Sequence, residues 1–295
     1  MAAASLLTQF SDELTALVDA AGSFAGQIRS ESTRPITAIL WTQDAVVTSE
    51  QILAEAPEYE VRISGQTVRA TLAGRDPGTN VAVLRLQTAV TASLPPASDA
   101  KSGALAIVIG NGGETLSAHL DIIRSAGGAW ESMAGSTIDR RILLAGRIGS
   151  DEGGPVLSAG GGLFGMSTRG ARRSSLVIPA STIARAVTTL MEKGSVERGW
   201  LGVALRPVAL PETLRPAREQ RSGMMVMDVS DGSPAAKAGV VAGDIILSAD
   251  NLPAIRYGAI ARQLGARAIG KKIALAVARA GAVVTVDVTV EARPA

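Results

Sequence analysis

The sequence predicts a mainly β protein of two domains, in which a β-sandwich or β-barrel is followed by a smaller α/β unit. Three observations support this fold class. Short runs of Val, Ile, Leu and Ala alternate with turn residues over most of the chain. Aromatic residues make up only 3% of the 295 residues, so the core must be aliphatic. A helical pattern near residue 180 then separates these runs from a second stretch with its own pattern.

The first domain is predicted to begin after a short helix. Residues 8–21 have helical spacing, with Leu14, Leu17 and Val18 on one face and Gly22 as a stop. The strands that follow are short and roughly evenly spaced, which is typical of a sandwich or barrel and not of βαβ units. They are expected at 37–41, 45–48, 59–63, 81–86, 105–110, 141–148 and 162–167.

A second helix is predicted within residues 178–194, where apolar side chains recur at intervals of three and four residues. Ser181 or Thr182 is expected to cap its start, and Gly194 to end it. The next unit has expected strands at 201–207, 223–229, 244–249, 272–279 and 282–291, with helices at 234–239 and 256–266. The predicted organisation is therefore an N-terminal helical segment (1–22), a β domain (23–194) and a second domain (195–295).

Composition argues against several classes of function. The formal charge is only +2 and no long Lys/Arg run occurs, so nucleic-acid binding is not expected. The chain has no cysteine and a single histidine, His119, so neither a metal site nor another cofactor is expected. No stretch of about 18 apolar residues appears, which argues against a membrane span.

Three local strings, in this order, carry a family resemblance. They are AVVTSEQIL (45–53), GRDPGTNVAVLRL (74–86) and GSDEGGPVL (149–157). These strings resemble the stretches that hold the His, Asp and Ser of the HtrA/DegP family of serine proteases. Flanking strings such as LVIPASTIARAV (176–187) agree, and the resemblance extends from about residue 10 to 293. It implies a trypsin-like double β-barrel followed by a PDZ domain.

The resemblance also implies that the catalytic triad is replaced. The base position matches Gln51, the carboxylate position Asn80 and the nucleophile position Glu152. Triad chemistry needs a hydroxyl nucleophile, an imidazole to take its proton and a carboxylate to orient the imidazole. An amide cannot act as that base, and an ionised Glu152 would repel a developing oxyanion. We therefore expect an inactive pseudoprotease rather than an enzyme.

The oxyanion hole is expected to be altered as well. The family uses a backbone N–H at a glycine two residues before the nucleophile, and Ser150 stands at the matching position. Two alternatives remain open: a cryptic serine endopeptidase that uses Ser150, or a hydrolase or cation site that uses Asp151 and Glu152. His119 is the only imidazole available to either, and it lies in a further predicted strand, LSAHLDII (116–123), far from Gln51 in sequence.

The second domain carries the binding site that we expect to survive. The string RGWLGVAL (198–205) resembles the carboxylate-binding loop and groove strand of the family's PDZ domains. Successive backbone N–H groups can hold a terminal carboxylate, and an edge strand can pair with an extended peptide. The string GSPAAKAGVVAGDIIL (232–247) matches the turn–helix–turn of this module. The expected binding residues are Trp200, Leu201, Gly202, Val203, Leu205, Ile260 and Leu264.

These expectations favour an adaptor, a chaperone-like holder or a structural subunit that binds protein C-termini or extended peptides. The resemblance also implies an oligomer, usually a trimer in this family, made either of identical chains or of this chain with an active paralogue. No basic segment precedes an apolar run at the start. The sequence thus predicts a cytoplasmic protein if Met1 is the native start, and a periplasmic or other extracytoplasmic protein if the start has been trimmed.

Overall fold

The computed structural model describes residues 5–30, 34–91, 93–111, 113, 115–132, 135–170, 174–196, 199–210, 212–215, 220–265 and 268–292. It divides into two compact units, Met1–Trp130 with Thr137–Val196, and Glu131–Ser136 with Glu197–Ala295. The short segment 131–136 thus belongs to the second unit, whereas the sequence analysis placed it in the first domain. Its Gly135 lies so close to Ala261 that a Cβ atom would come within 2.5 Å of the Ala261 carbonyl oxygen.

The first unit begins with a closed six-stranded barrel in the order β1-β2-β3-β6-β5-β4. Strand β3 is buried along its whole length, whereas β4 alternates buried and exposed residues and so has one face toward solvent. This barrel uses β1 (Ala25–Arg29), β2 (Ile36–Thr42), β3 (Ala45–Ser49), β4 (Tyr59–Ile63), β5 (Gln66–Asp76) and β6 (Val81–Leu86).

A second closed six-stranded barrel follows in the order β11-β14-β13-β12-β7-β8. It uses β7 (Leu105–Gly110), β8 (Ser117–Ala126), β11 (Ile142–Leu144), β12 (Pro155–Ser158), β13 (Leu163–Arg169) and β14 (Ser175–Pro179). The strand expected at 141–148 is shorter, because pairing between β8 and β11 becomes irregular after Leu143 and residues 145–154 form the loop that leads to β12. Two short strands, β9 (Trp130–Glu131) and β10 (Thr137–Ile138), pair with each other.

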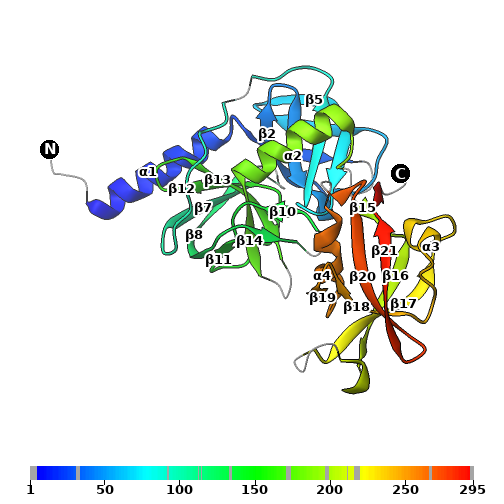
Figure 1. Ribbon diagram of the computed structural model, residues 1–295. Helices are drawn as coiled ribbons and strands as arrows, with labels where there is room; N and C mark the ends of the chain where they lie inside the picture. Colours follow the sequence, from blue (N-terminus) through cyan, green and yellow to red (C-terminus); the bar gives the residue numbers. More distant parts are fainter. Residues whose placement is uncertain are drawn as a thin grey trace. The chain divides into compact units, whose positions relative to one another are not determined.

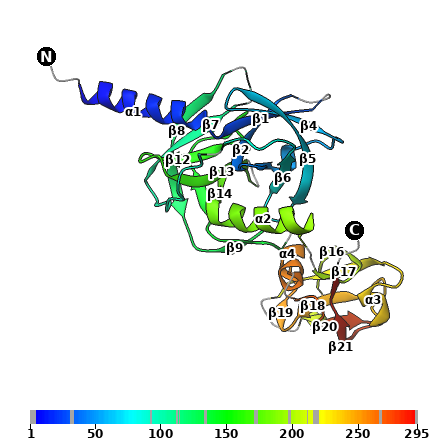
Figure 2. The ribbon, with the colours of Figure 1, turned by 90° about the horizontal axis from the view of Figure 1, so that it is seen from above.

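Two longer helices accompany the barrels. Helix α1 (Leu6–Ala21) begins at Ser5, whose hydroxyl caps it, and its exposed first turns extend away from the barrels (Figures 1 and 2). Helix α2 (Ala180–Lys193) packs against strands of both barrels, as Figure 2 shows, and ends at Gly194 with φ +73°. Within the described parts of the chain, no helix is long and apolar enough to cross a membrane.

The cap expected for α2 is not formed by the predicted side chains. Its N-cap residue is Pro179, which provides no capping hydrogen bond. Ser181 and Thr182 lie within the first turn instead, and the Thr182 hydroxyl accepts a hydrogen bond of 3.0 Å from the Asp139 N–H. Pro179 is the extended last residue of β14 and pairs with Gly165 of β13, so the helix begins directly after it at Ala180, and the N-cap lies two residues before Ser181.

The second unit is a sheet in the order β16-β17-β18-β20-β21, so β16 and β21 are its edges. Its strands are β15 (Gly199–Trp200), β16 (Val203–Ala209), β17 (Ser222–Val229), β18 (Ile245–Ala249), β19 (Leu252–Pro253), β20 (Lys272–Arg279), β21 (Ala282–Thr289) and β22 (Glu291–Ala292). Its helices are α3 (Pro234–Lys237) and α4 (Tyr257–Ala261), and 3-10 turns are η3 (Glu212–Leu214) and η4 (Arg262–Leu264). The predicted helix at 256–266 is therefore an α-helical turn and a 3-10 turn.

Each unit has its own aliphatic core. The larger core of the first unit fills the first barrel and continues under α2 and into the second barrel. The core of the second unit lies between the sheet and its two helices. The predicted mainly β fold, with a double barrel followed by a small α/β unit, is confirmed.

Candidate functional site

The three residues that match the triad positions lie together in the first unit. Gln51 follows β3 in the 3-10 turn η1 (Glu50–Ile52), Asn80 precedes β6, and Glu152 lies in the loop before β12. The Gln51 backbone N–H donates to Asn80 Oδ1 at 2.9 Å, and Gln51 Nε2 donates to Glu152 Oε1. Residues from both barrels thus meet at one site.

Glu152 is the buried centre of this site, with only 2% of its surface exposed. Its Oε1 accepts hydrogen bonds from Ser49 Oγ (3.1 Å), Thr168 Oγ1 (3.1 Å) and the Arg169 N–H (3.3 Å), and Oε2 pairs with Arg169 Nε. Burial alone would raise the pKa of Glu152, but hydrogen bonds from Gln51 and Arg169 and the charge of Arg169 hold this pKa below its ordinary value. The carboxylate is therefore ionised near neutral pH and already bound by the protein.

Asn80 completes the arrangement from a left-handed conformation, φ +57°. Asparagine tolerates this region better than most residues. Its Nδ2 donates to Ser49 Oγ at 2.9 Å and to Thr168 Oγ1 at 2.5 Å. We call the connected set the Glu152 network; its members are Ser49, Gln51, Asn80, Glu152, Thr168 and Arg169.

Half of the Glu152 network was not predicted from the sequence. Ser49 lies within the first family-like string, two residues before Gln51, and this proximity is the only signal that could have found it. Thr168 and Arg169 lie at the end of β13, where nothing in the sequence distinguishes them from other strand residues. Their role appears only when the second barrel brings β13 beside Glu152.

Ser150 and the pair Asp151/Glu152 have different surroundings. Ser150 is exposed, and its carbonyl oxygen accepts a weak hydrogen bond of 3.4 Å from Thr37 Oγ1. The Asp151 carboxylate accepts from Ser117 Oγ at 2.9 Å and lies 3.3 Å from His119 Nδ1. The two neighbouring carboxylates therefore bind different partners, Asp151 toward β8 and Glu152 toward β13, and do not converge on one point.

His119 is held in a structural contact. Its Nδ1 faces Asp151, while its Nε2 is buried and has no hydrogen-bond partner among the described residues. A general base must reach the proton that it removes, and a buried Nε2 does not. Among these described residues, moreover, no group of three or more His, Asp or Glu side chains is arranged to bind a metal ion.

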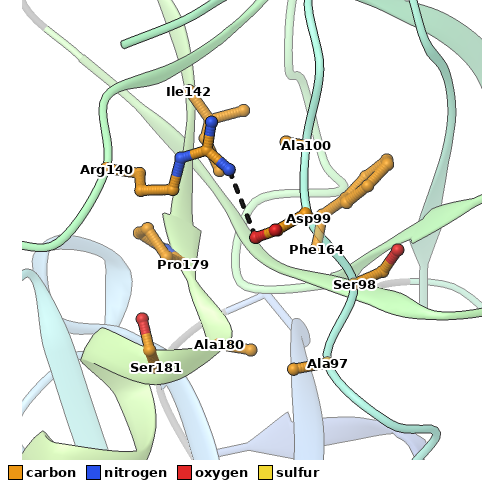
Figure 3. Close-up of a pocket in the computed structure, with 10 residues that line it drawn as sticks. All are labelled: Ala97, Ser98, Asp99, Ala100, Arg140, Ile142, Phe164, Pro179, Ala180 and Ser181. Carbon is orange, nitrogen blue, oxygen red and sulfur yellow. Dashed lines mark hydrogen bonds and ion pairs between the residues drawn. The ribbon is translucent and has the colours of Figure 1, made fainter. Parts of the chain in front are cut away.

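A separate cavity of about 500 Å³ lies on the second barrel (Figure 3). Its apolar wall includes Ile142 and Phe164, and the side chains of Arg140 and Asp99 point toward each other and form an ion pair of 3.3 Å. It is lined by none of the site residues expected from the sequence.

The predicted carboxylate loop of the second unit joins β15 to β16. The Leu201 carbonyl accepts from the Ala235 N–H at 2.9 Å, and the Gly202 carbonyl from the Ser230 N–H at 2.8 Å, so the loop is fixed against the start of α3. Within the described chain, the N–H groups of Leu201 and Gly202 have no protein acceptor. The loop thus offers adjacent free donors, the arrangement that binds an anion.

Gly202 is required by the geometry of this loop. Its φ is +77°, a value that glycine adopts without strain. A Cβ atom on Gly202 would lie 2.2 Å from Ser233 Cβ, closer than non-bonded carbon atoms can approach. Ser233 is the N-cap of α3, so the glycine permits the loop and this helix to lie together.

The side chains expected to line the groove are buried to different degrees. Val203, Leu205 and Leu264 are half-buried and lie at the margin of the core, and α4 packs beside β16. Ile260 and Leu201 are each only 2% exposed, and a contact of Ile260 with a bound peptide stays a prediction. Both side chains belong to the core of the second unit, Ile260 from α4 and Leu201 from the loop between β15 and β16.

Comparison with known proteins agrees with these two units. Residues 36–166 match the family model of the trypsin-like peptidase domain, and residues 199–290 match that of the PDZ domain. A protein of Brucella suis named probable periplasmic serine endoprotease DegP-like is 30% identical over 265 residues, which cover 84% of this chain and 50% of the relative. A protein of the same name from Pseudomonas fulva is 30% identical over 85% of this chain and 54% of its own length.

Solved structures show the same arrangement of elements. The HtrA-type protease AlgW with tripeptide is 26% identical with a TM-score of 0.69, and the match covers 96% of this chain and 98% of that one. The serine endoprotease from Yersinia pestis has a TM-score of 0.71 at 22% identity over 100% of both chains, which supports the fold alone.

The matched relatives also bear on size and location. This chain spans about half the length of the curated relatives that it matches. These relatives are named as periplasmic, so the expectation of a cytoplasmic location finds no support. With two closed barrels that match the trypsin-like peptidase domain and a sheet-and-helix unit that matches the PDZ domain, the chain is an HtrA/DegP-like protein.

Proposed function

We propose that this chain is a catalytically inactive HtrA/DegP-like protein that binds protein C-termini or extended peptides through its PDZ domain. The observation that supports catalytic inactivity is the Glu152 network. A buried carboxylate, paired with Arg169 and bound by three side-chain donors, stands where the family resemblance requires a nucleophilic hydroxyl. We infer that the former active site now joins the two barrels instead of performing chemistry.

The chemistry of each replaced group supports inactivity. Gln51 supplies an amide that donates to Glu152 and has no basic nitrogen. Asn80 donates to Ser49 and Thr168 and orients no imidazole. Loss of triad groups lowers turnover by several powers of ten, and the residual rate comes from binding alone.

The proposal of peptide binding rests on the PDZ domain. An edge strand, β16, begins directly after a loop with two free N–H groups and lies beside α4. Such a loop can hold a terminal carboxylate, and the strand can extend the sheet with the peptide. The related AlgW structure is named as containing a tripeptide, which supports peptide binding by this chain.

This assignment predicts that peptide binding depends on a free C-terminus. Hydrogen bonds to a charged group contribute about 1.5–3 kcal/mol, so amidation of the terminus should weaken binding at least about tenfold. Fluorescence anisotropy with labelled heptapeptides that end in valine, as the free acid and as the amide, measures this ratio on the full chain. Equal affinity of acid and amide, or no binding of either at millimolar concentration, would refute the proposed peptide site.

One alternative is favoured by a specific observation. The curated relatives are named as serine endoproteases, and Ser150, two residues before Glu152, is exposed. A cryptic endopeptidase would need a base for Ser150, and the buried Nε2 of His119 disfavours that role.

We also propose an extracytoplasmic location, since the matched relatives are named as periplasmic. An adaptor could act there as an oligomer of its own chains or as a non-catalytic partner of an active paralogue. Fractionation of the native cells, followed by cross-linking and identification of the bound chains, distinguishes these assemblies.

A further inference from the structure

The free edge of β16 has a defined set of hydrogen-bonding groups. Pro207 has no N–H, and proline is tolerated within a sheet where its nitrogen faces an unpaired edge. The N–H and C=O of one residue point to the same side of an antiparallel strand, and successive residues alternate. The backbone groups of Val203 and Leu205 must therefore face the free edge together with Pro207.

The pairing of β17 supports this orientation independently. Leu205 lies opposite Val226 in the register of β16 and β17. The Val226 N–H donates to the Asp244 carbonyl at 2.8 Å, and the Val226 carbonyl accepts from the Gly243 N–H at 2.8 Å, so both backbone groups point away from β16. Leu205 thus has no backbone partner on β17 and presents its N–H and C=O outward. A peptide can pair with Val203 and Leu205, but Pro207 offers it no donor.

This orientation and the position of the loop determine the direction in which a bound C-terminus runs along β16. The free N–H groups of Leu201 and Gly202 lie at the start of β16, so a peptide held there by its carboxylate runs antiparallel to the strand. If its last residue lies opposite Val203, each earlier residue lies opposite the next residue of β16. The fourth residue from the end then lies opposite Arg206.

Arg206 lies on the solvent side of the edge strand. Exposure alternates over the first four residues of β16, with Val203 and Leu205 half-buried against the core and Ala204 and Arg206 exposed. Among the described residues, Arg206 forms no hydrogen bond or ion pair of its side chain. The neighbouring position differs, because Ala204 lies opposite the exposed carboxylate-bearing Asp228. Of the two peptide positions that face solvent, the fourth from the end thus lies beside the Arg206 guanidinium, and the second from the end does not.

We propose that Arg206 is a specificity-determining residue that selects peptides with an acidic side chain at the fourth position from the C-terminus. This inference rests on the proposed function of the PDZ domain. Oppositely charged residues directly across neighbouring strands attract, whereas like charges repel. Such pairs at a solvent-exposed edge contribute modestly, so the expected preference for glutamate over glutamine is about 1.5- to 5-fold in Kd at low salt.

The test uses the full chain and four labelled heptapeptides that end in valine as the free acid. They carry glutamate, glutamine or lysine at the fourth position from the end, or glutamate at the second. The wild type should bind the peptides with affinity falling from glutamate to glutamine to lysine at the fourth position, and glutamate at the second position should bring no gain. Arg206→Gln should remove the preference, and Arg206→Glu should reverse it.

Two outcomes separate this inference from the function on which it rests. If all free-acid peptides bind but glutamate and lysine at the fourth position bind equally, the role of Arg206 is refuted while the peptide site stands. If no free-acid peptide binds the wild type, the peptide site itself fails. Because Arg206 is exposed, its variants are expected to fold, and an unchanged thermal transition verifies this.

Discussion

Replacement of Glu152 by alanine is expected to lower the free energy of unfolding by about 2–4 kcal/mol. The substitution removes the acceptor for the buried hydroxyls of Ser49 and Thr168 and for Gln51, although Gln51 Nε2 still donates to the Arg169 carbonyl at 3.0 Å. It also removes the charge opposite Arg169, although that side chain is 56% exposed and partly returns to water. The expected loss therefore comes mainly from the unsatisfied hydrogen bonds.

Equilibrium urea denaturation of the full chain measures this loss. Neutralisation provides a matched comparison: Glu152→Gln should destabilise the protein clearly, whereas Glu60→Gln, at an exposed position of β4, should change stability by less than about 0.5 kcal/mol. An unchanged denaturation midpoint for Glu152→Ala would contradict a structural role of the network.

The same carboxylate makes stability depend on pH in a defined direction. Because the pKa of Glu152 is lower in the folded protein than its ordinary value, the unfolded chain takes up this proton more readily. Its contribution is fully present above the ordinary pKa of about 4.3 and is lost as pH falls through the lowered folded value. The glutamine variant should therefore lose less stability than the wild type over this acidic range.

Replacement of Gly202 by alanine is expected to weaken peptide binding strongly. Two effects act together, the unfavourable φ of +77° and a Cβ position only 2.2 Å from Ser233 Cβ. The loop must then move away from α3, and its two free N–H groups no longer converge. We expect a loss of at least about tenfold in affinity for the free-acid heptapeptide, which matches loss of the carboxylate contact.

Gly232 provides the matched control for this variant. It has a similar φ of +66°, but a Cβ atom there would meet no other atom within 4 Å. Gly232→Ala should cost about 1 kcal/mol of stability and leave peptide affinity unchanged. If Gly202→Ala binds the peptide as well as Gly232→Ala does, the loop is not the carboxylate site.

Much of the fold could be predicted because each element has a local signature. The aliphatic runs gave the positions of β2, β3, β6 and β7, and Gly194 marked the end of α2. The start of α2 and the end of β11 were less accurate, because both depend on strand pairing: Pro179 pairs with Gly165 as the end of β14, and the pairing of β11 with β8 becomes irregular after Leu143.

The candidate site could be predicted only in part, because it depends on contacts between residues that are distant in sequence. The family-like strings located Gln51, Asn80 and Glu152, which the structure brings together. Thr168 and Arg169 escaped prediction because their role depends on the approach of β13 to a loop of distant sequence. Ile260 was expected on the groove from the PDZ resemblance, and the burial of its side chain in the core could not be predicted, because it depends on how α4 packs against the sheet.

We propose above all that the site around Glu152 performs no serine chemistry. The most direct measurement incubates the purified full chain with a fluorophosphonate probe and, in parallel, with unfolded casein, beside an active trypsin-type protease. We expect no covalent labelling and intact casein, because Nδ1 of His119 faces Asp151, its Nε2 is buried, and Glu152 is held by Arg169. Labelling or cleavage by the wild type that disappears in Ser150→Ala would contradict this proposal.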